Sequence, residues 1–148
     1  MNDIPPAKDN TSNSAALTLD EAHITDFARQ FDPQPYHLDK TAGLNSIFGD
    51  LCASGWQVAA LGTRLVGDAL TKEGYPFVAL TRVDQLRWKR PMFVDEDLIA
   101  IVSIVSINPD CRVPGCQTVI VEADLQNSRG DSVAVMRCDA AVDSGDGR

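Results

Sequence analysis

The C-terminal half of the chain alternates between apolar and charged positions, as the strands of a half-buried sheet do. Leu86 and Trp88, for example, are interleaved with Arg87 and Lys89, and the later segments are rich in β-branched residues. Asn-Pro-Asp, Pro-Gly and Asn-Ser-Arg-Gly sequences separate the segments and are typical of turns. The pattern predicts four long antiparallel strands, over residues 77–89, 97–107, 117–126 and 132–142.

The N-terminal half carries helix signals instead. Asp20 can cap a helix that Asp32-Pro33 ends, because a residue before proline disfavours helical backbone. The stretch from there to His37 contains two prolines and is predicted to be extended or turned. Asp39 is a second cap, for a short helix over residues 40–46.

Residues 56–70 are apolar on nearly all sides, with only Gln57, Arg64 and Asp68 strongly polar. A helix of this kind is buried. Helices followed by four strands predict an α+β fold in which a curved antiparallel sheet wraps around the buried helix. Such a sheet leaves edges to cover, and pairing with a second copy would cover them, so a homodimer or higher homo-oligomer is expected.

The two ends of the chain differ from the middle in composition. Residues 1–17 are mostly polar and are predicted to be a flexible N-terminal arm, with a short strand over residues 15–18 at its end. Residues 144–148 are predicted to be a flexible tail. The folded part is then one domain, residues 18–143, in a chain of 148 residues.

Charge and hydropathy exclude several classes of protein. A formal net charge of −8 argues against a nucleic-acid-binding protein, which needs clustered Lys and Arg. No run of 18 apolar residues and no secretory signal are visible, so neither a membrane span nor export is expected, and the prediction is a cytoplasmic protein. An anionic ligand would need a local basic patch; Arg82, Arg87, Lys89 and Arg90 could supply it, or could simply form a solvated strand face.

The cysteines and histidines predict no metal site. The four cysteines form no Cys-x-x-Cys pair and the chain has two histidines, so free thiols are expected. Cys111 and Cys116 flank a predicted hairpin tip where a disulfide is geometrically feasible. A disulfide is not expected in a cytoplasmic protein.

The run Asp32-Pro-Gln-Pro-Tyr-His37-Leu-Asp39 resembles the signature of the MaoC-like dehydratases, Gly-Asp-x-Asn-Pro-hydrophobic-His-x-Asp. The resemblance extends over about residues 18–142 and includes Ala53-Ser-Gly55 and the segment from Leu86 to Asp97. It implies the hot-dog fold, a usually dimeric assembly and hydration of trans-2-enoyl-CoA to the (R)-3-hydroxyacyl-CoA, or the reverse. The expected substrate is an acyl-CoA thioester, and no cofactor is implied beyond the coenzyme A of the substrate. Four positions depart from the pattern: Phe31 for Gly, Gln34 for Asn, Ser54 for His and Asp95 for Gly.

Hydration needs a base toward water, an acid toward the α-carbon and donors for the thioester oxygen. His37 is the natural base and Asp32 a candidate partner, although the sequence leaves the two roles open because such a pair can titrate as a unit. Gly55, near the start of the buried helix, can present free N–H groups and allow a ligand to approach closely. The resemblance adds Ser54 and Thr63 as substrate-binding candidates.

Two other function classes stay open. Hot-dog thioesterases usually place a carboxylate on or beside the central helix, where this chain offers Asp68. A degenerate hot-dog subunit that binds acyl-CoA without turnover would account for the altered residues Phe31 and Gln34.

Overall fold

In the described part of the chain, the sheet consists of four long strands and two short ones. A computed structural model describes residues 11–145. The long strands are β3 (Phe77–Trp88), β4 (Asp97–Asn108), β5 (Cys116–Asn127) and β6 (Ser132–Asp143). They pair antiparallel in the order β4-β5-β6-β3, and β1 (Thr11–Asn13) and β2 (Leu17–Thr18) both pair with β4. The four predicted strands are therefore confirmed to within one residue at each end.

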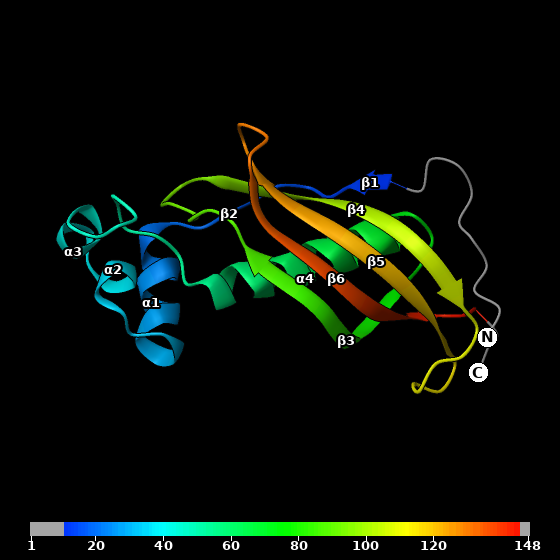
Figure 1. Cartoon of the computed structure of the whole chain (residues 1–148). Helices are drawn as coiled ribbons and strands as arrows, with labels where there is room; N and C mark the ends of the chain where they lie inside the picture. Colours follow the sequence, from blue (N-terminus) through cyan, green and yellow to red (C-terminus); the bar gives the residue numbers. More distant parts are fainter. Residues whose placement is uncertain (1–10, 146–148) are drawn as a thin grey trace.

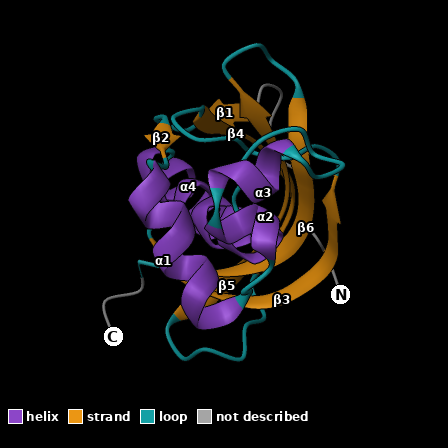
Figure 2. Ribbon diagram, turned by 90° about the vertical axis from the view of Figure 1, so that its left-hand side faces the viewer, coloured by secondary structure: helices purple, strands orange, loops and turns teal. Residues whose placement is uncertain are grey.

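The long helix α4 (Gly55–Lys72) lies against the concave face of this sheet, which curves around it (Figures 1 and 2). Val66 and Leu70 of α4 are fully buried with Val102 and Val121 of the sheet. Burial of such side chains is worth about 1.5–3 kcal/mol each and is the main force that holds the layers together. The predicted α+β architecture is confirmed.

Two glycines of α4 allow the sheet to approach the helix closely. A Cβ atom on Gly62 would lie 2.7 Å from Leu125, and one on Gly67 would lie 2.8 Å from the ring of Phe77. Both distances are shorter than van der Waals contact, so larger residues would push β5 and β3 away. The prediction of a helix buried nearly all round is wrong on one side, because Trp56, Ala60, Arg64 and Asp68 form an exposed stripe with a four-residue spacing.

Three short helices form a lobe at one end of the sheet: α1 (Glu21–Phe31), α2 (Pro35–Leu38) and α3 (Lys40–Leu44) (Figure 1). The predicted caps are confirmed, since Asp20 accepts from the His23 N–H and Asp39 from the Ala42 N–H. The predicted extended or turned stretch is confirmed for residues 32–34, but it ends at Pro35, where the single turn of α2 begins. Pro35 stands at the first position of α2, where its missing N–H costs nothing and its φ suits a helix.

The chain ends are more ordered than the sequence predicts. Residues 11–17 of the expected arm belong to the sheet through β1 and β2, because β4 has an edge that they can pair with. Ser144 of the expected tail donates twice to the Gly115 carbonyl, from its N–H and its hydroxyl. Residues 1–10 and 146–148 lie outside the described part. Between residues 11 and 145, no helix is both long and apolar enough to cross a membrane.

Asp95 is the described non-glycine residue with left-handed backbone, at φ 61°. Its N–H donates to the Leu19 carbonyl at 2.8 Å, which ties the β3–β4 connection to the residue after β2. L-residues other than glycine are strained in this region, Asp and Asn less than most.

We expect Asp95→Gly to raise the free energy of unfolding by up to about 1 kcal/mol, since relief of strain outweighs the added backbone entropy of the unfolded chain. Asp95→Val should lower it by about 1–2 kcal/mol, because a β-branched residue fits this φ worst. Chemical denaturation monitored by circular dichroism measures both. The matched control is Glu96→Gly, which can only destabilise; an equal loss from Asp95→Gly would contradict the strain argument.

Candidate active site

Asp32 and His37 meet at the junction of two short helices. Asp32 caps the C-terminus of α1, with its N–H donating to the Ala28 carbonyl at 2.9 Å. His37 lies in the single turn of α2, with its N–H donating to the Gln34 carbonyl. This geometry places Nε2 of His37 3.5 Å from an Oδ of Asp32. The five-residue spacing predicted from the sequence thus brings the two side chains together.

The backbone fixes the tautomer of His37. Its Nδ1 lies 2.6 Å from the carbonyl oxygen of Cys52, and that oxygen can only accept a hydrogen bond. Nδ1 therefore carries the proton, and in the neutral ring Nε2 has a free lone pair directed toward Asp32. The His37 residue is only 6% exposed, so its ring is held in place by packing.

Ser54 joins the carboxylate to the central helix. Its hydroxyl donates to Asp32 Oδ2 at 2.7 Å and accepts from the Trp56 N–H at 3.3 Å, as the N-cap of α4. Ser54 is fully buried, so both bonds are shielded from water. The Ser54 hydroxyl therefore fixes the Asp32 carboxylate beside the start of α4. The sequence predicted Ser54 as a substrate-binding residue; its hydroxyl is instead occupied by the protein.

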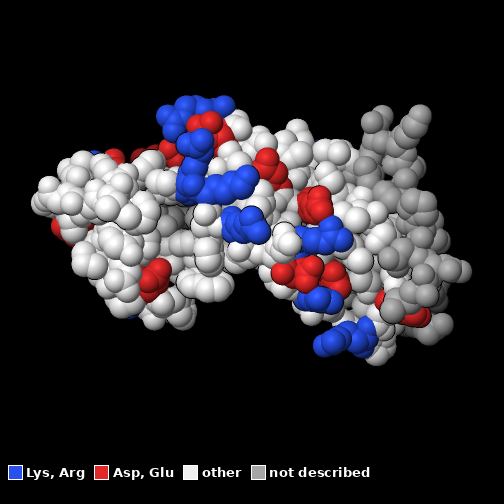
Figure 3. All heavy atoms as spheres, in the orientation of Figure 1, with Lys and Arg blue, Asp and Glu red and all other residues white. Residues whose placement is uncertain are grey.

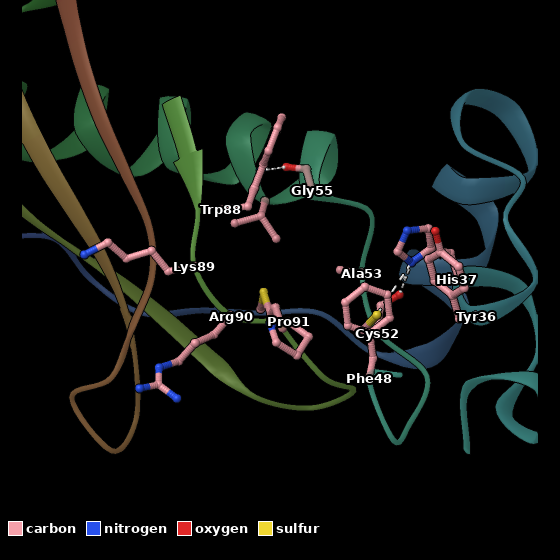
Figure 4. Close-up of a pocket in the computed structure, with 12 residues that line it drawn as sticks. Tyr36, His37, Phe48, Cys52, Ala53, Gly55, Trp88, Lys89, Arg90 and Pro91 are labelled. Atoms are coloured by element: carbon pink, nitrogen blue, oxygen red, sulfur yellow. Dashed lines mark hydrogen bonds between the residues drawn. The ribbon is translucent and has the colours of Figure 1, made fainter. Parts of the chain in front are cut away.

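A cavity of about 290 Å³ opens beside His37. Figure 4 shows His37 and Tyr36 at one end and Lys89 and Arg90 at the other, with Ala53 and Pro91 between them. The Tyr36 ring packs edge-on against His37 with a centroid distance of 4.6 Å, and Phe48 lies 5.0 Å beyond Tyr36. The walls are mostly apolar, as in sites that exclude bulk water from a reaction.

Gly55 lines the same cavity, but the group that approaches it closely is a side chain of the protein, the indole of Trp88. The Trp88 indole donates from Nε1 to the Gly55 carbonyl at 2.7 Å, and a Cβ atom at Gly55 would lie 2.8 Å from that ring. The predicted need for glycine is thus explained by Trp88. The Gly55 N–H has no acceptor one turn earlier in the helix, because it stands at the first position of α4.

Thr63 is separated from His37 by the structure. Its hydroxyl donates to the Ala59 carbonyl at 3.0 Å within α4. It lines a different hollow, together with Arg64, Asp68 and Phe77. Asp68, the carboxylate that a thioesterase would use, is exposed there and lies 3.6 Å from Arg64.

The thiol of Cys52 lies 3.7 Å from His37 Nδ1, in the arrangement of a Cys–His nucleophile. Burial raises the pKa of this thiol to about 11, with Asp50 contributing, so it stays protonated at neutral pH. The Cys52 carbonyl, and not its thiol, is the group that matters to His37. All four cysteines are free, as predicted, and residues 11–145 contain no cluster of His, Cys, Asp and Glu suited to a metal.

A family model described as "MaoC like domain" matches residues 4–126. The chain belongs to the MaoC-like domain family. The crystal structure of a MaoC-like dehydratase from Rhodospirillum rubrum is 32% identical, with a TM-score of 0.76 over 93% of this chain and 92% of that one. This agreement confirms the hot-dog fold.

Two more distant similarities are to a solved structure with the same fold and to a bacterial protein. The unliganded R-hydratase PhaJ1 of Pseudomonas aeruginosa is 19% identical, with a TM-score of 0.69 over 95% of this chain and 86% of that one. The uncharacterized protein YdeM of Bacillus subtilis (strain 168) is 28% identical over 109 residues, which is 72% of this chain and 74% of that protein.

Some parts of the site in this MaoC-like domain are invisible to sequence reasoning. The Cys52 carbonyl is a backbone group and carries no residue signal. The Trp88 contact joins residues 33 positions apart, which no local pattern reveals. Tyr36 and Phe48 could have been suspected as wall residues, because each flanks a motif.

We expect Ser54→Ala to lower the free energy of unfolding by about 1–3 kcal/mol, because α4 loses its cap and a half-buried carboxylate loses its donor. Urea denaturation measures the change. Ser128→Ala, at an exposed turn position, is the control and should stay within about 0.5 kcal/mol of the wild type. Equal effects of the two substitutions would show that the Ser54 bonds contribute little.

Proposed function

We propose that this MaoC-like domain is a hydratase or dehydratase of acyl thioesters, acting in the (R)-specific hydration of trans-2-enoyl-CoA or its reverse. The observation that carries the proposal is the position of His37 Nε2, which lies 3.5 Å from a carboxylate oxygen, in a ring whose Nδ1 is held by the Cys52 carbonyl and which lines an apolar cavity. A base in such a place can activate a water molecule toward a ligand in the cavity.

In the proposed reaction, His37 Nε2 takes a proton from water as the water oxygen bonds to the β-carbon. The imidazolium that forms is 3.5 Å from Asp32, whose negative charge stabilises it. The α-carbon then receives one proton from the Asp32–His37 pair, so one water molecule is added in total. Ser54 contributes by holding the Asp32 carboxylate in a fixed position through its hydrogen bond.

The negative charge that builds up on the thioester oxygen needs a donor. The Gly55 N–H stands at the positive end of the 18-residue helix α4 and lines the cavity. Such a preorganised backbone donor lowers the barrier without reorganisation during the reaction. We assign this role to the start of α4.

The two other function classes gain no support from the geometry. The thioesterase hypothesis needs the carboxylate of Asp68, on the central helix, at the site, and Asp68 lines a different hollow. The hypothesis of an inert subunit depended on Phe31 and Gln34, and both side chains are exposed and outside the cavity lining. These departures from the signature therefore leave the Asp32–His37 pair unaltered.

We expect the purified protein to hydrate a trans-2-enoyl-CoA, with loss of the ultraviolet absorbance of the conjugated thioester. Asp32→Asn and His37→Ala should each lower kcat by about 10²–10⁴-fold, the usual contribution of acid–base catalysis. His23→Ala removes the other histidine, which is exposed, and should leave kcat unchanged. A wild-type protein that binds enoyl-CoA of several chain lengths but turns over none would refute the proposal.

We also propose that the protein is a homodimer joined at β3. This strand ends the sheet, with β6 as its neighbour on one side, and it exposes Val78, Val83 and Trp88. An open edge with apolar side chains is a template for pairing with another strand. If the β3 strands of two copies pair antiparallel, the open N–H and C=O groups of both edges form hydrogen bonds in one two-fold symmetric contact.

Sedimentation velocity should therefore give a mass of about twice the 16.0 kDa of one chain. Val83→Lys should shift the dimer toward monomer, because a charge would be buried at the contact. Leu44→Lys, which places the same charge on an exposed position of α3, is the control. A monomer at all concentrations would refute the β3 interface.

A further inference from the structure

Unpaired positive charge gathers at one place on this acidic protein. Five arginines each lie within 4.0 Å of a carboxylate: Arg29, Arg64, Arg82, Arg129 and Arg137. No ion pair is present for the other cations of residues 11–145: Lys40, Lys72, Arg87, Lys89, Arg90 and Arg112. Three of these stand within four consecutive residues, 87–90, and their side chains are exposed.

Residues 88–90 of this segment line the cavity at the end opposite His37, and Arg87 precedes them on β3. Lys89 and Arg90 both line the cavity, and Figure 4 shows their side chains pointing outward from it. Figure 3 shows Lys and Arg side chains gathered where the β5–β6 turn adjoins the end of β3. A ligand with its reacting carbon at His37 would therefore have its far end among these cations.

The segment is held in a fixed position. The N–H groups of Lys89 and Arg90 both donate to the Val133 carbonyl, at 2.8 and 3.1 Å. Trp88, between Arg87 and Lys89, is bonded to Gly55. Anchoring on β6 and α4 reduces the entropy that the three cations lose when they bind an anion.

We propose that Arg87, Lys89 and Arg90 bind the phosphates of coenzyme A, so that the substrate is a free CoA thioester. This inference rests on the proposed function, since it takes the cavity as the thioester site. A protein with net charge −8 repels a polyanion unless positive charge is concentrated locally. Three adjacent cations match the several phosphates of the CoA nucleotide better than the single phosphodiester of a phosphopantetheine arm.

The test compares three crotonyl thioesters that differ in phosphate content: those of CoA, 4′-phosphopantetheine and pantetheine. The variant Arg87→Gln/Lys89→Gln/Arg90→Gln removes the cluster. The matched control, Lys40→Gln/Lys72→Gln/Arg112→Gln, removes the same charge from positions that do not line the cavity. Initial rates give kcat and KM, and calorimetry gives the affinity for free CoA.

The cluster variant should raise KM for crotonyl-CoA about tenfold, because the free energies of three individually weak, exposed contacts add up. Its kcat should be unchanged. Its KM for crotonyl-pantetheine should equal that of the wild type, and the control variant should change KM for crotonyl-CoA less than about twofold. Added salt should raise KM for crotonyl-CoA in the wild type and much less in the cluster variant.

Equal effects of the two triple variants on KM would overturn the inference, because they would show that KM depends on the net charge of the protein and not on the position of these three cations. An equal rise for the CoA and phosphopantetheine esters would overturn the nucleotide assignment and point to a carrier-protein arm. If the wild type turns over none of the esters, the proposed function fails. Calorimetry then decides the inference separately: weaker CoA binding by the cluster variant supports it, and unchanged or absent binding refutes it.

Discussion

The close packing of the curved sheet on α4 is the constraint on which the rest of the structure depends. Gly62 and Gly67 let β5 and β3 come within contact distance of the helix backbone, so the helix is buried along most of its length. A helix held in this way has a fixed N-terminus. Ser54, the N-cap of the helix, is therefore also fixed, and its hydroxyl donates a hydrogen bond that positions Asp32.

The site is assembled from segments that lie far apart in the sequence. α1 and α2 supply the side chains of Asp32 and His37, the loop before α4 supplies the Cys52 carbonyl, and the end of β3 supplies Trp88. Each piece is connected to a different layer of the fold. The site therefore exists only when the helical lobe, the central helix and the edge strand are in place together, and its integrity reports on the whole domain.

Much of the fold could be predicted from the sequence because the signals are local. Alternation located the four long strands to within one residue, and Asp20 and Asp39 are caps as their positions suggested. The Asp32–His37 contact followed from a motif on one continuous segment. Periodicity did not predict β1, because a three-residue strand is created by the edge of β4 that it pairs with.

Three predicted site residues, Gly55, Thr63 and Ser54, have contacts within the protein that the sequence does not reveal. A glycine at position 55 is compatible with close approach of either a ligand or an indole ring. Only the tertiary structure shows that the ring of Trp88 is the close neighbour. Thr63 was proposed from the family resemblance, and in this chain its side chain lines a different hollow from His37. A buried serine can serve a ligand or the protein, and the donor geometry of Ser54 shows that its hydroxyl serves the protein.

The hydrogen bond from His37 Nδ1 to the main chain at Cys52 has a consequence for the evolution of the site. Most histidines that act as bases are oriented by an acidic side chain, which a single substitution can remove. A carbonyl oxygen belongs to every residue type, so substitution at position 52 leaves the orienting group present. The tautomer of the imidazole is thus set by the path of the loop, while the buried side chain at position 52 is limited by packing and not by the hydrogen bond.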